Sequence, residues 1–284
     1  MTERAITFGP AGALVGVLGE PERSVRRDGP ALLLWNVGVN HHVGPSRIWV
    51  DLSRRLVRAG FVVLRFDLGG LGDSEPRRDG SSEADAGLAD IRDAMDTVTR
   101  HTGVEKFAVA GFCSGVDTAH AIAALERRVI AAVFVEGYTY PTLLHRIRSP
   151  FDVLRLPRWQ RYLAGKFPRL GIGGDRTGLR DLAEAEPIFV RDYPKEDRFK
   201  AEVRSMLDAG KKLLFVYAGA KRDHYSYAKQ VLDVLGRFRG RHVEISYMKR
   251  ADHVFSRHED RLALLDRMTV FFLNGFETAP RRLT

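Results

Sequence analysis

The stretch Gly111-Phe112-Cys113-Ser114-Gly115 lies between two contrasting patterns in this 284-residue chain. The short apolar run Lys106–Ala110 before it is typical of a buried strand, and Val116–Arg127 after it has a helical pattern. Two glycines flanking a central residue, between a strand and a helix, are the spacing of a nucleophile elbow. The elbow needs these glycines because the nucleophile occupies a strained turn where flanking side chains would collide with the neighbouring backbone.

The elbow spacing places Cys113, the only cysteine of the chain, at the nucleophile position. For Ser114 to be the nucleophile instead, glycines would be needed where the chain has Phe112 and Val116. The simpler interpretation of Cys113 is a small buried thiol, which is the usual fate of an isolated cysteine. Its position between strand and helix, and the partners that follow, favour the catalytic interpretation.

A thiol nucleophile needs a base and an acid that orients the base, and both follow in the expected chain order. Asp223 comes after the predicted strand Leu213–Ala218, and His253 comes after the last predicted strand. We expect His253 to take the thiol proton and Asp223 to fix its tautomer. Glu136, which ends another predicted strand, remains an alternative acid, whereas Asp252 is a less natural partner because it is adjacent to His253.

An acyl-transfer site also needs donors for the developing oxyanion. We expect one donor to be the backbone N–H of Ser114 and the other to be Val39, with Gly38 as an alternative. His41 and His42 in the same loop resemble metal ligands, but no acidic or cysteine partner stands at a matching spacing. We therefore expect them to be pocket-wall or loop residues, and we expect neither a metal nor a cofactor.

Strand and helix patterns alternate along most of the chain, which predicts an α/β fold with a mostly parallel sheet flanked by helices. The predicted core strands are Ala31–Trp35, Phe61–Phe66, Lys106–Ala110, Val129–Val135, Leu213–Ala218 and Val243–Met248, with a hairpin at Ile6–Phe8 and Leu14–Leu18. The predicted helices are Ser46–Ala59, Ser82–Thr99 with Ser82 as N-cap, Val116–Arg127 and Glu259–Leu273.

The alternation breaks between residues 138 and 210, which we predict to be an inserted helical cap on a core formed by residues 1–137 and 211–284. Its first part, Tyr138–Leu170, has seven basic residues and one acid, interleaved with apolar side chains. Either this is a solvated face or it recognises an anionic acyl carrier. We expect substrate contacts from four cap residues: Arg155, Arg158, Trp159 and Tyr162.

Composition excludes several classes of protein. An apolar share of 44% fills a sizeable core, and no apolar run is long enough for a membrane helix. The N-terminus lacks a secretory signal pattern, and a single cysteine is consistent with a reducing cytoplasm, so we expect a cytoplasmic protein. Despite a net charge of +9, no nucleic-acid-binding motif is present, so we expect neither nucleic-acid nor membrane partners.

The sequence resembles the α/β-hydrolase superfamily over nearly its whole length. Besides the elbow, Phe66-Asp67-Leu68-Gly69-Gly70-Leu71-Gly72-Asp73-Ser74 is similar to a loop of that family. The stretch from Asn36 to Arg47 resembles hydrolases related to serine aminopeptidases and to exosortase-associated hydrolases. The family usually has serine at the elbow. Dienelactone hydrolases and polyhydroxyalkanoate synthases have cysteine, so the resemblance implies thioester or activated acyl substrates.

These observations predict an acyl hydrolase that attacks an ester, thioester or amide carbonyl through a Cys113–His253–Asp223 triad and a covalent acyl-enzyme. The substrate is a small acyl compound, with coenzyme A or a carrier protein as a potential carrier. An acyltransferase or cyclase would use the same intermediate with another second nucleophile. The alternative from another class is a non-catalytic binding protein of the same fold.

Overall fold

The computed structural model describes residues 1–25, 28–145, 193–219, 225–236 and 242–276. Within these residues one eight-stranded sheet has the order β1-β2-β4-β3-β5-β6-β7-β8. β1 and β2 form an antiparallel hairpin, β2 pairs antiparallel with β4, and all the other pairs are parallel. The strands are β1 (Thr2–Phe8), β2 (Leu14–Glu20), β3 (Ala31–Leu34), β4 (Val63–Phe66), β5 (Phe107–Phe112), β6 (Val129–Val135), β7 (Lys212–Ala218) and β8 (Val243–Met248).

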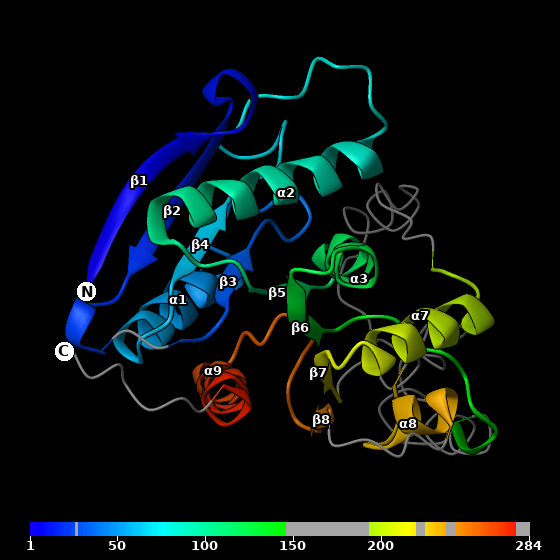
Figure 1. The fold of residues 1–284 in the computed structure, drawn as a ribbon. Coiled ribbons are helices and arrows are strands. Elements are labelled where there is room, and N and C mark those ends of the chain that lie inside the picture. The colour runs from blue at the N-terminus through cyan, green and yellow to red at the C-terminus, as the bar shows by residue number, and fades with distance from the viewer. Residues whose placement is uncertain (26–27, 146–192, 220–224, 237–241, 277–284) are drawn as a thin grey trace, which may run out of the picture.

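Helices cover both faces of the sheet, because each central strand presents apolar side chains to both sides (Figure 1). On β3, Leu32 and Leu34 pack with the helices of one face, and Ala31 and Leu33 pack with those of the other. The first face is covered by α1 (Ile48–Arg58) and α9 (His258–Gly275). The second is covered by α2 (Glu83–Thr102), α3 (Gly115–Leu125), α7 (Glu196–Asp208) and α8 (Gln230–Leu235). The predicted α/β architecture is confirmed.

Most predicted elements appear, with ends that differ for local reasons. The predicted N-cap is present, because the Ser82 hydroxyl accepts the Asp85 N–H at 3.2 Å where α2 begins. The first helix starts later than predicted, at Ile48, because Ser46 and Arg47 have φ angles of 49° and 65°. Left-handed residues interrupt a right-handed helix, so Pro45–Arg47 forms a separate 3₁₀ turn.

The predicted cap region includes a helix that packs with the core. Phe199, Val203 and Met206 of α7 are buried in the same cluster as Phe134 of β6 and Phe215 of β7. α7 therefore belongs to the helical layer of the core and lies in the connection between the parallel strands β6 and β7. The predicted boundary at residue 210 assigned this core helix to the cap. Residues 146–192, most of the predicted cap, lie outside the described residues, and the cap itself remains a prediction. None of the described helices has the length and apolar character needed to cross a bilayer.

The predicted elbow joins β5 to α3 in a tight turn. Cys113 has a φ of 51°, a left-handed conformation that costs a non-glycine residue free energy. A Cβ added at Gly111 would lie 2.4 Å from the carbonyl oxygen of Gly115, and one at Gly115 would lie 2.8 Å from that of Asn36. Both glycines are therefore required by close backbone approach, as the sequence pattern predicted.

Gly111→Ala should destabilise the protein by more than about 2 kcal/mol, since the added methyl group meets backbone that cannot move aside. The matched control is Gly87→Ala in the interior of α2, where the new Cβ would meet only Thr118 Cγ2 at an ordinary 3.5 Å. That control should be neutral or stabilising by up to about 1 kcal/mol, because alanine is the better helix former. Urea unfolding of both variants measures the difference, and equal stabilities would contradict the strained-turn account.

Candidate active site

The elbow and the loop after β8 bring Cys113 and His253 together. His253 Nε2 lies 3.2 Å from Cys113 Sγ, within hydrogen-bond distance for sulfur. The Cys113 backbone is fixed to the neighbouring strand, because its N–H donates to the Val135 carbonyl at 2.8 Å. Cys113 as a whole residue is partly exposed. Its sulfur therefore has a nitrogen base beside it.

The second imidazole nitrogen of His253 faces a carboxylate from β6. His253 Nδ1 lies 2.7 Å from Glu136 Oε2, and Glu136 Oε1 accepts the Ala218 N–H at 2.5 Å. Glu136 follows directly on β6 and has a φ of 54°, so it occupies a second left-handed turn at this end of the sheet. The thiol and the carboxylate thus lie at the ends of β5 and β6. The amide that orients the carboxylate belongs to β7, and the imidazole belongs to the loop after β8.

The carboxylate on His253 is the alternative that the sequence left open. Asp223, the acid expected from chain order, lies outside the described residues. Asp252 instead folds back on its own loop, where Oδ1 accepts the N–H groups of Val254 at 3.0 Å and Ser256 at 3.1 Å. Burial tends to raise the pKa of Asp252, but the hydrogen bonds from Ser256 and the loop amides outweigh it and lower the pKa. Asp252 therefore shapes the loop that carries His253.

The surroundings of His253 favour its charged form. The hydrogen bond with Cys113, followed by that with Glu136, raises its pKa from 6.5 to about 9, although burial opposes this shift. An imidazolium at neutral pH stabilises a thiolate beside it. The ring is held in place by Phe112, which makes edge contacts with His253 and with Phe255 at centroid distances of 6.3 and 5.9 Å.

The loop after β3 passes close to the elbow. The Gly38 N–H donates to Ser114 Oγ at 2.7 Å, and Gly38 has a φ of 56°. Asn40 N–H closes a tight turn onto the Val37 carbonyl at 3.1 Å, which leaves the Val39 side chain 87% exposed. The predicted oxyanion donors Ser114 and Val39 thus belong to two segments in contact, while Gly38, the alternative donor, already binds the Ser114 hydroxyl.

The side chain of Asn36 holds this loop against the loop after β4. Its Nδ2 donates to the Asn40 carbonyl at 2.9 Å and to Asp67 Oδ1 at 2.7 Å, and its Oδ1 accepts the Leu68 N–H at 2.6 Å. The sequence reasoning did not select Asn36 as functional. Its position directly after a buried strand was the signal that was available.

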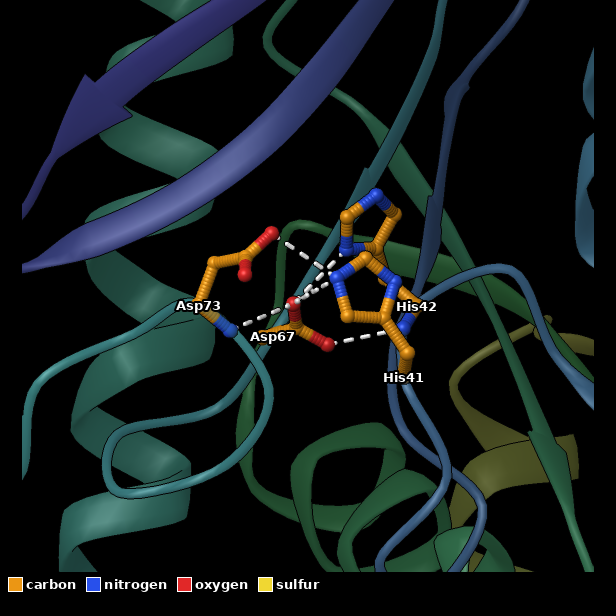
Figure 2. Close-up of side chains that lie close together, drawn as sticks. All are labelled: His41, His42, Asp67 and Asp73. Atoms are coloured by element: carbon orange, nitrogen blue, oxygen red, sulfur yellow. Dashed lines mark hydrogen bonds and ion pairs between the residues drawn. The ribbon is translucent and has the colours of Figure 1, made fainter.

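His41 and His42 have acidic partners that their spacing along the chain did not indicate. Asp67 and Asp73, from the loop after β4, lie against both imidazoles (Figure 2). His42 Nδ1 is 2.7 Å from Asp67 Oδ2, and His41 Nε2 is 2.8 Å from Asp73 Oδ2. Burial tends to raise the pKa of Asp67, but the hydrogen bonds from His42 and the Asp73 amide outweigh it and lower the pKa. The expected cap contacts Arg155, Arg158, Trp159 and Tyr162 lie outside the described residues.

The comparisons with known proteins agree with this architecture. A family model described as the alpha/beta hydrolase fold matches residues 38–175, which include the elbow and the loops after β3 and β4. Together with the sheet order, the match establishes that this chain has the α/β-hydrolase fold. The match also supports the predicted relationship of the chain to the α/β-hydrolase superfamily. No curated protein sequence matches the chain.

Solved structures of the same fold are similar over almost the whole chain. A serine hydrolase without a lid from Xanthomonas campestris is 15% identical with a TM-score of 0.59, covering 99% of this chain and 98% of that chain. An esterase from Pyrococcus furiosus is 14% identical with a TM-score of 0.60, covering 98% and 92%. The α/β hydrolase GrgF from a Penicillium species is 18% identical with a TM-score of 0.57, covering 98% and 100%. At these identities the likeness is one of fold.

We expect the His253 imidazole to titrate at about pH 9, so that it remains protonated throughout the neutral range. Cys113→Ala should lower this pKa because it removes the first of the two stabilising partners, and Glu136→Gln should lower it because it removes the second. Long-range ¹H–¹⁵N NMR spectra report the titration, with His253→Gln identifying the resonance. A wild-type pKa near 6.5 that neither substitution changes would show that the imidazole does not interact with either group in solution.

Proposed function

We propose that this protein is an acyl hydrolase whose nucleophile is Cys113, with His253 as base and acid and Glu136 as the orienting carboxylate. The continuous chain from Cys113 Sγ to His253 Nε2 at 3.2 Å, and from His253 Nδ1 to Glu136 Oε2 at 2.7 Å, carries this proposal. It is the arrangement in which a base activates a nucleophile and a third group orients the base. The fold shared with an esterase and a serine hydrolase is consistent with it.

The reaction begins with the thiolate of Cys113, whose proton resides on His253 Nε2. The sulfur attacks the carbonyl carbon of an ester, thioester or amide, and the carbonyl electron pair moves onto oxygen. The backbone N–H groups of Ser114 and Val39 stabilise this oxyanion. When the intermediate collapses, the leaving group takes the proton from His253 Nε2, and the acyl group remains on Cys113 as a thioester.

Release of the acyl group uses the same residues in reverse order. Neutral His253 removes a proton from water, and the oxygen attacks the thioester carbonyl. The second tetrahedral intermediate expels the Cys113 thiolate and the free acid, which regenerates the thiolate–imidazolium pair. Glu136 stays ionised throughout and holds Nδ1–H so that Nε2 faces the sulfur. An alcohol or amine in place of water would make the same acyl-enzyme a transferase or a cyclase.

Several features favour an enzyme over a binding protein of the same fold. The left-handed conformations of Cys113 and Glu136 are strained, and strain of this kind persists mainly where function requires it. The charged imidazole beside the thiol of a partly exposed cysteine is a reactive arrangement, whereas a structural cysteine is buried and inert. A thiolate nucleophile suits thioesters and activated esters, so coenzyme A or carrier-linked acyl groups are the substrates we propose to test first.

Glu136→Gln should lower the second-order rate constant for hydrolysis of an acyl thioester by on the order of 10²-fold or more, since the amide no longer orients the imidazole or stabilises its positive charge. His253→Ala should cost a similar factor, and Cys113→Ala should abolish the reaction. Steady-state assays with a panel of p-nitrophenyl esters and acyl thioesters measure these effects.

Two carboxylates and one histidine provide matched controls for the triad assignment. Asp252→Asn and Asp223→Asn should leave the rate within a few-fold of wild type, as should His258→Ala on the exposed first turn of α9. Loss of activity in Asp223→Asn with a normal Glu136→Gln would move the acid to the loop after β7. Equal rates for wild type and Cys113→Ala would instead favour the binding protein.

A further inference from the structure

The four side chains in Figure 2 come from two loops that are remote in sequence and converge on one point. His41 and His42 follow β3, whereas Asp67 and Asp73 belong to the loop after the neighbouring strand β4. Each of the four residues offers one ligand atom, and these four atoms all lie within 4.8 Å of one another. Both imidazole rings approach the same carboxylate oxygen, Asp67 Oδ2, at 3.2 Å for His41 Nε2 and 2.7 Å for His42 Nδ1.

We propose that His41, His42, Asp67 and Asp73 form a binding site for a divalent transition-metal ion such as Zn²⁺. Two imidazole nitrogens and two carboxylate oxygens are a complete set of four ligands for this ion. At bond lengths of about 2.0–2.2 Å, tetrahedral ligand atoms lie about 3.3–3.6 Å apart. The three shortest contacts, at 2.7, 2.8 and 3.2 Å, are slightly closer than this, so the side chains must rotate outward by a small amount to admit the ion.

The groups behind the ligands support the same assignment. Asp67 is fully buried, and its other oxygen, Oδ1, accepts the side-chain N–H of Asn36 and the backbone N–H of His42, both at 2.7 Å. The second oxygen, Oδ2, accepts the backbone N–H of Asp73 at 3.2 Å and faces the two imidazoles. Outer hydrogen bonds that orient a ligating carboxylate in this way are typical of metal centres.

The site has an entry path and a simple proton balance. The side chains of His41 and Asp73 are 36% and 62% exposed, while those of His42 and Asp67 are buried, so the ion would enter from the His41 side. Each imidazole must present an unprotonated nitrogen to the ion. Protons therefore compete with the ion, and metal binding weakens as the pH falls.

A metal ion here would join the loop after β3 to the loop after β4. Cys113 is not one of its four ligands, so this proposal does not rest on the acyl chemistry. Asn36 connects the two regions, because it holds both Asp67 Oδ1 and the carbonyl of Asn40 in the turn that contains Val39. The expected role of the ion is to stabilise this loop, so its binding should raise the melting temperature independently of the reaction that the protein catalyses.

The test is calorimetric titration of chelator-treated protein with Zn²⁺ alone, in the Cys113→Ala background so that the thiolate and His253 do not bind the ion. We expect one Zn²⁺ per chain and a higher melting temperature in its presence. His41→Ala and Asp73→Asn, chosen because both side chains are partly exposed and tolerate change, should each weaken binding by at least about 10-fold. Co²⁺ in the same titration should give the visible absorption of a tetrahedral site.

Matched controls separate this site from adventitious binding to surface side chains. His101→Ala and Asp51→Asn remove exposed residues of α2 and α1 and should leave the affinity unchanged. Zn²⁺ binding that is unaffected by His41→Ala and Asp73→Asn would overturn the proposal. Failure to bind Zn²⁺ up to millimolar concentration would also overturn it, and would identify the cluster as a hydrogen-bonded clasp between the two loops.

Discussion

The contact between His253 and its two partners is the interaction on which the site depends. A single imidazole lies between a thiol at 3.2 Å and a carboxylate at 2.7 Å. This alignment needs the carboxyl ends of β5, β6 and β8 in register, because the three groups follow three different strands. It also needs a left-handed backbone conformation at Cys113 and Glu136. This conformation costs free energy, which the packing of the surrounding sheet and helices must offset. The parallel sheet with its two apolar faces therefore serves to fix three side chains.

A second network of polar contacts holds the loop after β3, which includes the proposed oxyanion donor Val39. Asn36 and the buried carboxylate of Asp67 tie the loop after β3 to the loop after β4, and the same loop touches the elbow where Gly38 N–H meets Ser114 Oγ. The geometry of the proposed oxyanion region thus depends on polar contacts between loops, whereas the proposed triad depends on the ends of strands. His41 and His42 belong to this second network through their contacts with Asp67 and Asp73.

Features that depend on local sequence were predictable, and those that depend on which loops meet were not. The elbow could be predicted from the sequence because its two glycines, the strand before them and the helix after them are consecutive in the chain. The acid was ambiguous because chain order favoured Asp223, whereas only the register of β6 and β7 brings Glu136 to His253 and Ala218. The acidic partners of His41 and His42 could not be predicted from the sequence. Asp67 and Asp73 are remote from them in the chain, and only the pairing of β3 with β4 brings the two loops together.

The most direct measurement is the intact mass of the protein after brief exposure to an activated acyl ester or thioester. A thiolate beside a charged imidazole predicts one acyl group per chain, located by peptide mapping at Cys113, and prior alkylation of that thiol with iodoacetamide should prevent it. His253→Ala should accumulate the adduct far more slowly at neutral pH. A protein that still turns over substrate after Cys113 has been alkylated would contradict the account, because the nucleophile would then lie elsewhere.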